Sequence, residues 1–120
     1  MDAAARPTRL LQVGPLPQEP LAAAARFHAE TLAQALSCLA DDADLVLVFG
    51  AADHTHRDWR LGVVRGLARQ YAPLRVNAVA GDDEAAIAQA LAYLRAAPGV
   101  TGQLLSVDGT GAGPMLYQGE

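Results

Sequence analysis

Three side chains on one short segment are the first candidates for chemistry in this chain. Asp53, His54 and His56 follow an apolar run that ends at Gly50. Loops at the carboxyl ends of strands are where α/β proteins place functional groups. A His-x-His pair beside a carboxylate can bind zinc or move a proton, but a zinc site needs further ligands, and folding would have to bring in Asp108. The residue types therefore favour a solvated loop over a metal site.

The other groups that could react have weaker patterns. Ser106 lies inside a predicted strand rather than on the sharp turn that carries a hydrolase nucleophile. Cys38, the only cysteine, lies in an apolar helical pattern, which favours an inert core thiol in a reducing compartment. Asp41, Asp42 and Asp44 lack the ligand pattern of a calcium loop, so we expect a solvated turn there. We predict no metal ion.

The charge of the chain limits its partners. All nine basic residues are arginine, and the formal net charge is −4. An acidic chain lacks the basic face that non-specific nucleic-acid binding requires. No run reaches the roughly 18 apolar residues of a membrane span, and the amino terminus has no signal-peptide pattern. We expect a cytoplasmic protein that binds neither nucleic acid nor membrane. Four arginines of one predicted helix should pair with acids or lie over apolar surface, namely Arg57, Arg60, Arg65 and Arg69.

Alternating strand and helix patterns would position these groups. Short apolar runs bounded by turn residues predict strands at 8–14, 44–49, 74–81 and 103–107. Helical spacing predicts helices at 21–39, at 57–71 and from an N-cap at Asp82 to a stop at 97–99. With right-handed crossovers, this order gives a truncated Rossmann-like α/β fold, a four-stranded parallel sheet with three helices on its two faces. Residues 1–120 form one domain, in which 1–7 and 110–120 are expected to be flexible tails.

The apolar stripes of the helices predict what they contact. The first helix should bury a stripe made of Leu21, Ala25, His28, Leu32, Ala35 and Leu39. The second helix has two apolar faces. One would pack on the sheet through Leu61, Val64, Ala68 and Tyr71, and the other consists of Trp59, Gly62, Val63 and Gly66. Two glycines four residues apart beside an indole would let another backbone approach, although such glycines can also be merely tolerated.

Two stretches resemble the short-chain dehydrogenase/reductase family. Residues 66–81, GLARQYAPLRVNAVAG, are similar to the helix and sixth strand that follow the family's active-site segment. Residues 90–109, ALAYLRAAPGVTGQLLSVDG, are similar to its last helix and seventh strand, closest to the pteridine-reductase-like and ketoacyl-reductase-like branches. Residues 11–14 would stand where the family's fourth strand ends in Asn-Asn-Ala-Gly. The resemblance implies a Rossmann-like fold and NAD(P)-dependent carbonyl chemistry.

The chain departs from the family where the cofactor would bind. Family members are about twice as long, and their first three strands carry a glycine-rich dinucleotide loop. Here no strand is followed by such a loop, and the glycines of 109–113 come after the last strand with no helix behind them. We therefore expect no bound cofactor, and NADP or NAD only if a partner supplies the dinucleotide-binding half.

The catalytic positions depart as well. Counting back from Arg75 places the family's tyrosine and lysine at Asp53 and Arg57, and no serine lies between Ser37 and Ser106. An arginine could keep the charge of the lysine, but an aspartate cannot serve as the phenolic acid. These positions are degenerate, so we predict no catalytic residues.

These observations favour a non-catalytic, reductase-like subunit that acts in assembly. It would form a homodimer or a hetero-oligomer with a full-length reductase or another biosynthetic enzyme. The resemblance places the contacts at Trp59, Gly62, Val63, Gly66, Leu104, Leu105 and Val107. One alternative is an NAD(P)-dependent oxidoreductase, acting on carbonyl, ketoacyl or pteridine substrates and completed by a partner chain. Another is a small-molecule or nucleotide binder without chemistry.

Overall fold

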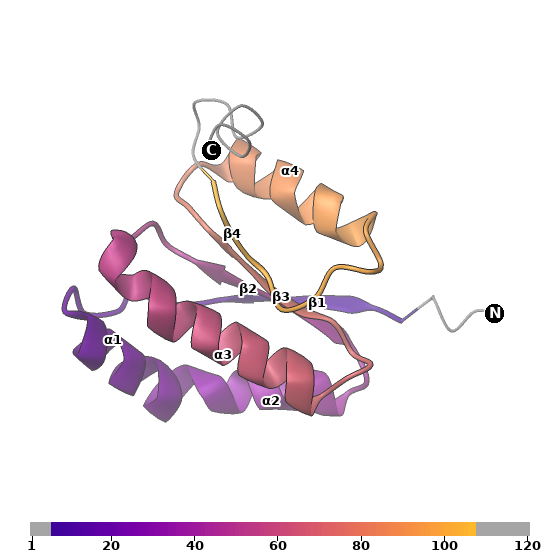
Figure 1. The fold of residues 1–120 in the computed structure, drawn as a ribbon, viewed down its shortest axis with the longest axis horizontal. Helices are drawn as coiled ribbons and strands as arrows, with labels where there is room; N and C mark the ends of the chain where they lie inside the picture. The colour runs from indigo at the N-terminus through magenta and orange to yellow at the C-terminus, as the bar shows by residue number, and fades with distance from the viewer. Residues whose placement is uncertain (1–5, 108–120) are drawn as a thin grey trace.

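The computed structural model describes residues 6–107 (Figure 1). Its strands are β1 (Thr8–Gln12), β2 (Asp44–Phe49), β3 (Val76–Ala80) and β4 (Leu104–Ser106). Its α-helices are α1 (Pro20–Arg26), α2 (Leu32–Ala40), α3 (Arg57–Gln70) and α4 (Glu84–Arg95). A π-helical stretch, η2 (Phe27–Thr31), joins α1 to α2, and a 3-10 turn, η3 (His54–His56), precedes α3. The predictions for residues 1–5, Asp108 and the carboxyl-terminal glycines lie outside the described residues.

The sheet is parallel throughout and has the order β1-β2-β3-β4, which confirms the predicted four-stranded α/β architecture. Every residue of β2 and β3 is buried, as expected for central parallel strands covered on both faces. β1 and β4 are the edges, and their side chains are half-buried or exposed. None of the helices in residues 6–107 is long and apolar enough to cross a membrane.

The helices divide unevenly between the two faces of the sheet. α1, α2 and α3 cover one face and α4 covers the other (Figure 1). Because the strands follow one another in one direction, connections on opposite faces must have opposite hands. The prediction of right-handed crossovers throughout is therefore wrong, since the β3–α4–β4 connection has the opposite hand to the first two. The helix of this connection, α4, covers Val46, Val48 and Val79. Without it, these apolar side chains on the second face of the central strands would be exposed to water.

The first helical region buries a different stripe from the predicted one. Its buried residues recur every four positions, at Ala23, Phe27, Thr31, Ala35 and Leu39. An α-helix of 3.6 residues per turn would rotate such a series off the core, and the wider turn of η2 takes up an extra residue and reduces that rotation. The predicted stripe is correct at its end but wrong at its start, where Leu21 is 80% exposed. Cys38 is half-buried against the same core.

The amino end of α4 differs from the prediction by one residue. Asp83, not Asp82, is the N-cap, and its carboxylate accepts a hydrogen bond from the Ala86 amide at 2.8 Å. Asp82 instead accepts from the amide of Ala51 at 3.0 Å. This bond ties the loop after β3 to the loop after β2, at the carboxyl ends of the strands.

Candidate functional site: an open cleft at the carboxyl ends of the strands

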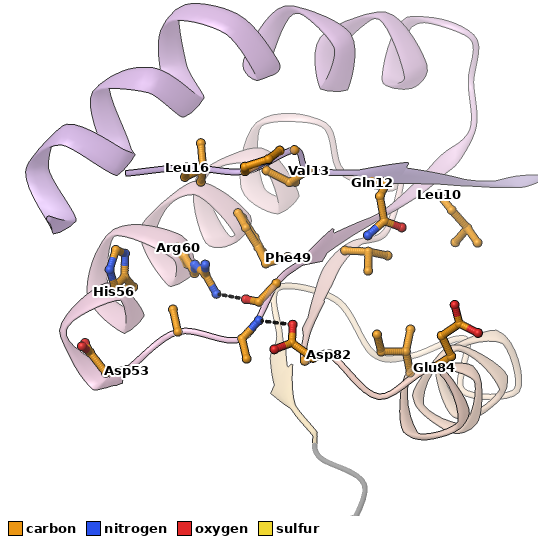
Figure 2. Close-up of a pocket in the computed structure, with 18 of the residues that line it drawn as sticks. Leu10, Gln12, Val13, Leu16, Phe49, Asp53, His56, Arg60, Asp82 and Glu84 are labelled. Carbon is orange, nitrogen blue, oxygen red and sulfur yellow. Dashed lines mark hydrogen bonds between the residues drawn. The ribbon is translucent and has the colours of Figure 1, made fainter. Parts of the chain in front are cut away.

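A cleft of about 790 Å³ lies at the carboxyl ends of β1, β2 and β3 (Figure 2). The loops after these strands and the first turns of α4 form its walls. It is open because α4 covers β2 and β3, while no helix in the described part of the chain covers β1 on that face, so Leu10 is 48% exposed. Its apolar lining includes Val13, Leu16, Phe49, Ile87 and Leu91. The cleft is where parallel α/β sheets place ligands.

Arg60 lies in the wall of this cleft and is buried, with 7% of its surface exposed. Its Nη1 donates to the Gly50 carbonyl at 3.0 Å, and its guanidinium carbon lies 4.4 Å from the Phe49 ring centroid and 5.8 Å from that of Trp59. Burial lowers the pKa of the guanidinium below its usual value, because desolvation disfavours the charged form. An arginine nevertheless stays charged at neutral pH.

Arg60 was predicted, with three other arginines of this helix, to pair with acids or lie over apolar surface, and its burial in the cleft wall was not predicted. α3 turns Arg60, Val64 and Leu67 toward the sheet, whereas the predicted core face began at Leu61. The spacing of three and four residues was visible in the sequence. A charged residue rarely belongs to a core stripe, so this spacing alone does not predict that Arg60 is buried.

His56 is also buried, at 5% exposure, and both of its ring nitrogens are engaged. Its Nε2 lies 2.9 Å from the Gln18 carbonyl, and its Nδ1 lies 3.1 Å from the Trp59 indole nitrogen. Because a carbonyl only accepts and an indole only donates, these partners assign the proton to Nε2. His56 therefore holds the loop after β1 against α3. In residues 6–107, no three His, Cys, Asp or Glu side chains lie close enough together to hold a metal ion.

Asp53 lines the cleft, but its carboxylate forms hydrogen bonds within its own turn. It caps η3, and its carboxylate accepts hydrogen bonds from the Thr55 hydroxyl and, at 2.9 Å, from the Thr55 amide. These two bonds lower the pKa of Asp53 below its usual value of 3.8, the hydroxyl having the larger effect. His54 and Arg57 are exposed, and Arg57 does not line the cleft. The predicted trio Asp53, His54 and His56 is thus adjacent in sequence but does not converge on one point.

Acidic groups lie on the opposite side of the cleft from the Arg60 wall. Asp82 and Glu84 are in the loop after β3 and the first turn of α4 (Figure 2). Asp82 is fixed by the Ala51 amide, whereas Glu84 is exposed. The cleft therefore offers a cation on one side and carboxylates on the other.

The predicted contact residues lie in three different surroundings. Trp59 and Val63 are half-buried in this chain's own core, where Trp59 packs against Phe27 and Phe49 with ring centroids 5.6 and 5.7 Å apart. A Cβ added at Gly62 or Gly66 would meet no atom within 4 Å. The remaining three are half-buried on and just after the edge strand β4, namely Leu104, Leu105 and Val107.

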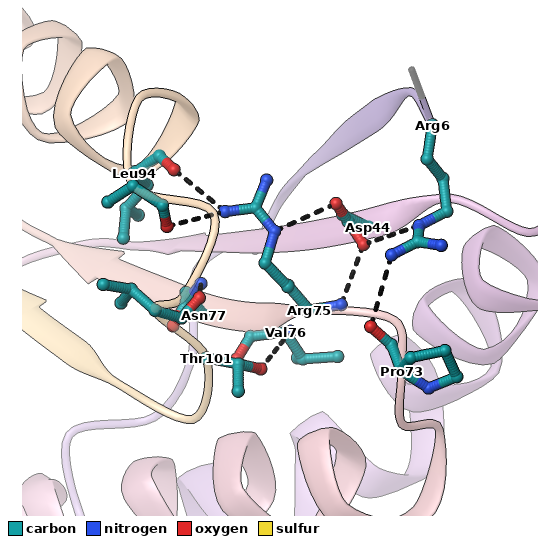
Figure 3. A network of polar contacts seen from close by, with 10 residues as sticks. Arg6, Asp44, Pro73, Arg75, Val76, Asn77, Leu94 and Thr101 are labelled. Atoms are coloured by element: carbon teal, nitrogen blue, oxygen red, sulfur yellow. Dashed lines mark hydrogen bonds and ion pairs between the residues drawn. The ribbon is translucent and has the colours of Figure 1, made fainter. Parts of the chain in front are cut away.

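A second polar cluster lies at the opposite, amino ends of the strands (Figure 3). Asp44, predicted to be in a solvated turn, is 5% exposed and starts β2, so that prediction is wrong. Its carboxylate accepts from Nε of Arg6 at 3.2 Å and from the amide and Nε of Arg75 at 2.8 and 3.1 Å. Arg75 also donates to the carbonyls of Leu94 and Ala97. The network joins β2, β3 and the end of α4. Asp44 can be buried because arginines distant in the sequence neutralise its charge. Asp41 and Asp42 are exposed, as predicted.

Comparison with known proteins adds one finding. A family model described as "Short chain dehydrogenase-like protein" matches residues 11–107, which include almost all of both stretches named in the sequence analysis. No curated protein and no solved structure matches the chain.

Proposed function

This chain belongs to the short-chain dehydrogenase-like proteins, and from that premise we propose that it is a non-catalytic reductase-like subunit that acts in assembly. It forms a homodimer or docks on a full-length reductase or another biosynthetic enzyme. Its resemblance to the pteridine-reductase-like and ketoacyl-reductase-like branches is part of the same proposal.

The observation that carries this proposal is the open edge at β1. Among the described residues β1 pairs only with β2, and Leu10 on this strand is 48% exposed. An edge strand presents unpaired amides and carbonyls, and proteins usually cover or blunt such an edge. In a full-length reductase the corresponding strand would face another strand. A partner chain that covers β1 would satisfy these groups here.

The surroundings of the degenerate catalytic positions support the absence of chemistry. An ionised carboxylate only accepts hydrogen bonds, and the carboxylate of Asp53 is held by Thr55. It cannot protonate a substrate as a phenol does. Arg57 lies outside the cleft lining, so it is not placed to hold a ligand in the cleft.

The face of α3 that carries Gly62 and Gly66 is the helical part of the proposed interface. Because a Cβ added at Gly62 meets no described atom within 4 Å and Gly62 is exposed, we expect a Gly62→Leu change to test the interface with little crowding of the monomer. It should also favour the helix, since glycine is about 1 kcal/mol worse than the best helix formers. We expect Gly62→Leu to raise the monomer fraction in light scattering, while Gly62→Ala, which adds one methyl group, has a smaller effect.

Two results would contradict the assembly proposal at different levels. A Gly62→Leu protein as dimeric as the parent would remove the α3 interface but leave the β1 edge. A parent chain that is monomeric and does not bind a purified full-length reductase of its own organism would remove the assembly role.

The second candidate is an NAD(P)-dependent oxidoreductase completed by a partner chain. The open cleft at the carboxyl ends of the strands favours it, because that is where such folds bind cofactors. Trp59 is the only tryptophan and lies beside the cleft, so its fluorescence reports binding. We expect NADPH and NADH at micromolar concentration to leave this fluorescence unchanged. A saturable micromolar change that excess inorganic phosphate does not compete away would favour the oxidoreductase.

A further inference from the structure

Arg60 is a buried cation that no carboxylate within the described part of the chain neutralises. Among residues 6–107 it forms no ion pair within 4.0 Å, and its only hydrogen bond is the one from Nη1 to the Gly50 carbonyl. Its Nε is fully buried and has no hydrogen-bond partner. A guanidinium has five N–H donors, so most of its capacity is unused by the protein.

Such a buried cation is unfavourable unless a counter-charge and hydrogen-bond acceptors are supplied to it. A buried charge without a partner destabilises a fold, and apolar side chains of similar size are often tolerated better at such positions. The rings of Phe49 and Trp59 offset part of the loss by cation–π attraction, at 4.4 and 5.8 Å. They do not satisfy the hydrogen-bond donors. The contrast with Asp44, which has three donors from two arginines, shows that this chain can neutralise a buried charge.

The position of Arg60 in the cleft wall indicates where a partner could come from. No acid of the cleft pairs with Arg60, since Asp53 is held by Thr55, Asp82 is held by the Ala51 amide, and the exposed Glu84 lies on the opposite side. Close to Arg60 the cleft is apolar, with Phe49, Val13 and Leu16 (Figure 2). Low-polarity walls strengthen an ion pair with a bound anion.

We propose that the cleft binds a small organic oxyanion, a carboxylate or a phosphate monoester, that pairs with the guanidinium of Arg60. Guanidinium forks match the geometry of both groups. Because Asp82 and Glu84 line the other side, the ligand presents hydroxyl or amino donors there rather than a second negative charge. The site requires no cofactor and is independent of the assembly role.

The first test measures thermal stability and Trp59 fluorescence of the full chain. The probes are inorganic phosphate, glycerol 3-phosphate and lactate, each against sodium chloride at equal ionic strength. A ligand that binds only the folded state raises the melting temperature in a saturable way. We expect this for at least one probe, and the comparison of phosphates with lactate identifies the preferred oxyanion. A parent protein that responds to every probe as it does to chloride would overturn the proposal.

The second test uses Arg60→Met, which keeps an unbranched apolar stem and removes the guanidinium with its charge. Without added anion, the variant should melt at the same temperature as the parent or higher, because a buried unpaired charge is gone. Its affinity for the active probe should fall at least about tenfold, the loss expected for a charge-assisted hydrogen bond. Arg65→Gln is the control, since Arg65 is exposed on the same helix, and it should respond like the parent.

A purely structural role for Arg60 predicts the reverse pattern. Arg60→Met would then melt lower and keep the parent's response to anions, and that result would overturn the proposal. If the variant does not fold, the arginine Nε–H resonances of the unmodified chain give the answer. A titration with the active probe should shift the Arg60 resonance more than that of Arg65, and equal shifts would contradict binding at Arg60.

Discussion

At the scale of single residues, the two ends of the sheet treat buried charge in opposite ways. Asp44 at the amino end is held by Arg6 and Arg75, so its charge is compensated within the chain. Arg60 at the carboxyl end is compensated, within residues 6–107, only by aromatic rings and one carbonyl. The first arrangement fixes the fold, and the second leaves a binding group available. The two sites therefore predict opposite responses to loss of charge.

Asp44→Asn should destabilise the protein strongly. The change leaves Arg75 without its counter-charge while keeping the size of the side chain. We expect the free energy of unfolding in urea to fall by about 3 kcal/mol, the low end for a broken buried pair, because Arg75 keeps some contact with water. Asp41→Asn is the control, since Asp41 pairs with Arg9 at the surface. This change should lower the free energy of unfolding by less than about 1 kcal/mol. Equal effects of the two variants would contradict a structural role for the buried network.

Asp53 should make a small contribution to stability that depends on pH. Its pKa is lowered in the folded state by the hydrogen bonds from Thr55, so folding favours the ionised form. This contribution to stability is present at pH values above the pKa of the unfolded state, near 3.8. It is lost as the pH falls through the lower pKa of the folded state. Asp53→Asn should therefore reduce the pH dependence of the urea midpoint below about pH 4. A slope unchanged from the parent would show that Thr55 does not hold the carboxylate in solution.

At the scale of elements, the least supported strand is β4, which has three residues and one neighbour. Two contacts on β3 hold it in register. Asn77 is buried and its side chain bonds the Val100 carbonyl and the Gln103 amide at 3.0 Å each. Just after β3, the backbone of Gly81 lies so close to Val107 that an added Cβ would be 2.6 Å from the Val107 carbonyl oxygen. Side-chain bonds at one end and a glycine contact at the other thus fix this edge.

Gly81→Ala should loosen the end of β4 without unfolding the sheet. The new methyl group collides with backbone rather than with a flexible side chain, so Val107 must move away and lose its amide bond to Ala80. We expect faster hydrogen exchange at the Val107 amide and a modest loss of stability. Gly99→Ala is the matched control, because an added Cβ there meets no atom within 4 Å. The same exchange rate in both variants would contradict the close contact.

At the scale of the whole molecule, the sheet formed by residues 6–107 has two open edges and one uncovered face along β1. Three helices cover one face, and α4 alone covers the other (Figure 1). The same geometry produces the cleft and the exposed edge, because both follow from the absence of a helix over β1 among the described residues. A partner along β1 and a ligand in the cleft would therefore be neighbours.

Leu10→Lys tests whether β1 is an association surface. A lysine on an exposed edge strand opposes strand addition, and a change at a half-exposed position should alter the free energy of unfolding by less than about 1 kcal/mol. We expect weaker self-association in sedimentation velocity at unchanged monomer stability. Leu21→Lys is the control, because Leu21 is more exposed than Leu10 but lies on α1, away from this edge. If both variants associate like the parent, β1 is not the contact surface.

The sequence by itself determined the order of strands and helices, the parallel sheet and the family resemblance. These follow from local features, such as the uninterrupted apolar run of β2 and the stop signals after α4, which act within a few residues. Tertiary structure alone decided which charged side chains are buried. Asp44 is buried because cations 31 and 38 residues away reach it, and Arg60 is buried because α3 turns it under Phe49. Packing also decided the hand of the last crossover and the π-helical turn. Both bury core residues, and no local sequence pattern predicts either of them. Asp53 and His56 of the cleft were in the first candidate segment, but the other walls and Arg60 could not be predicted, because a binding cleft is made by segments that meet only after folding.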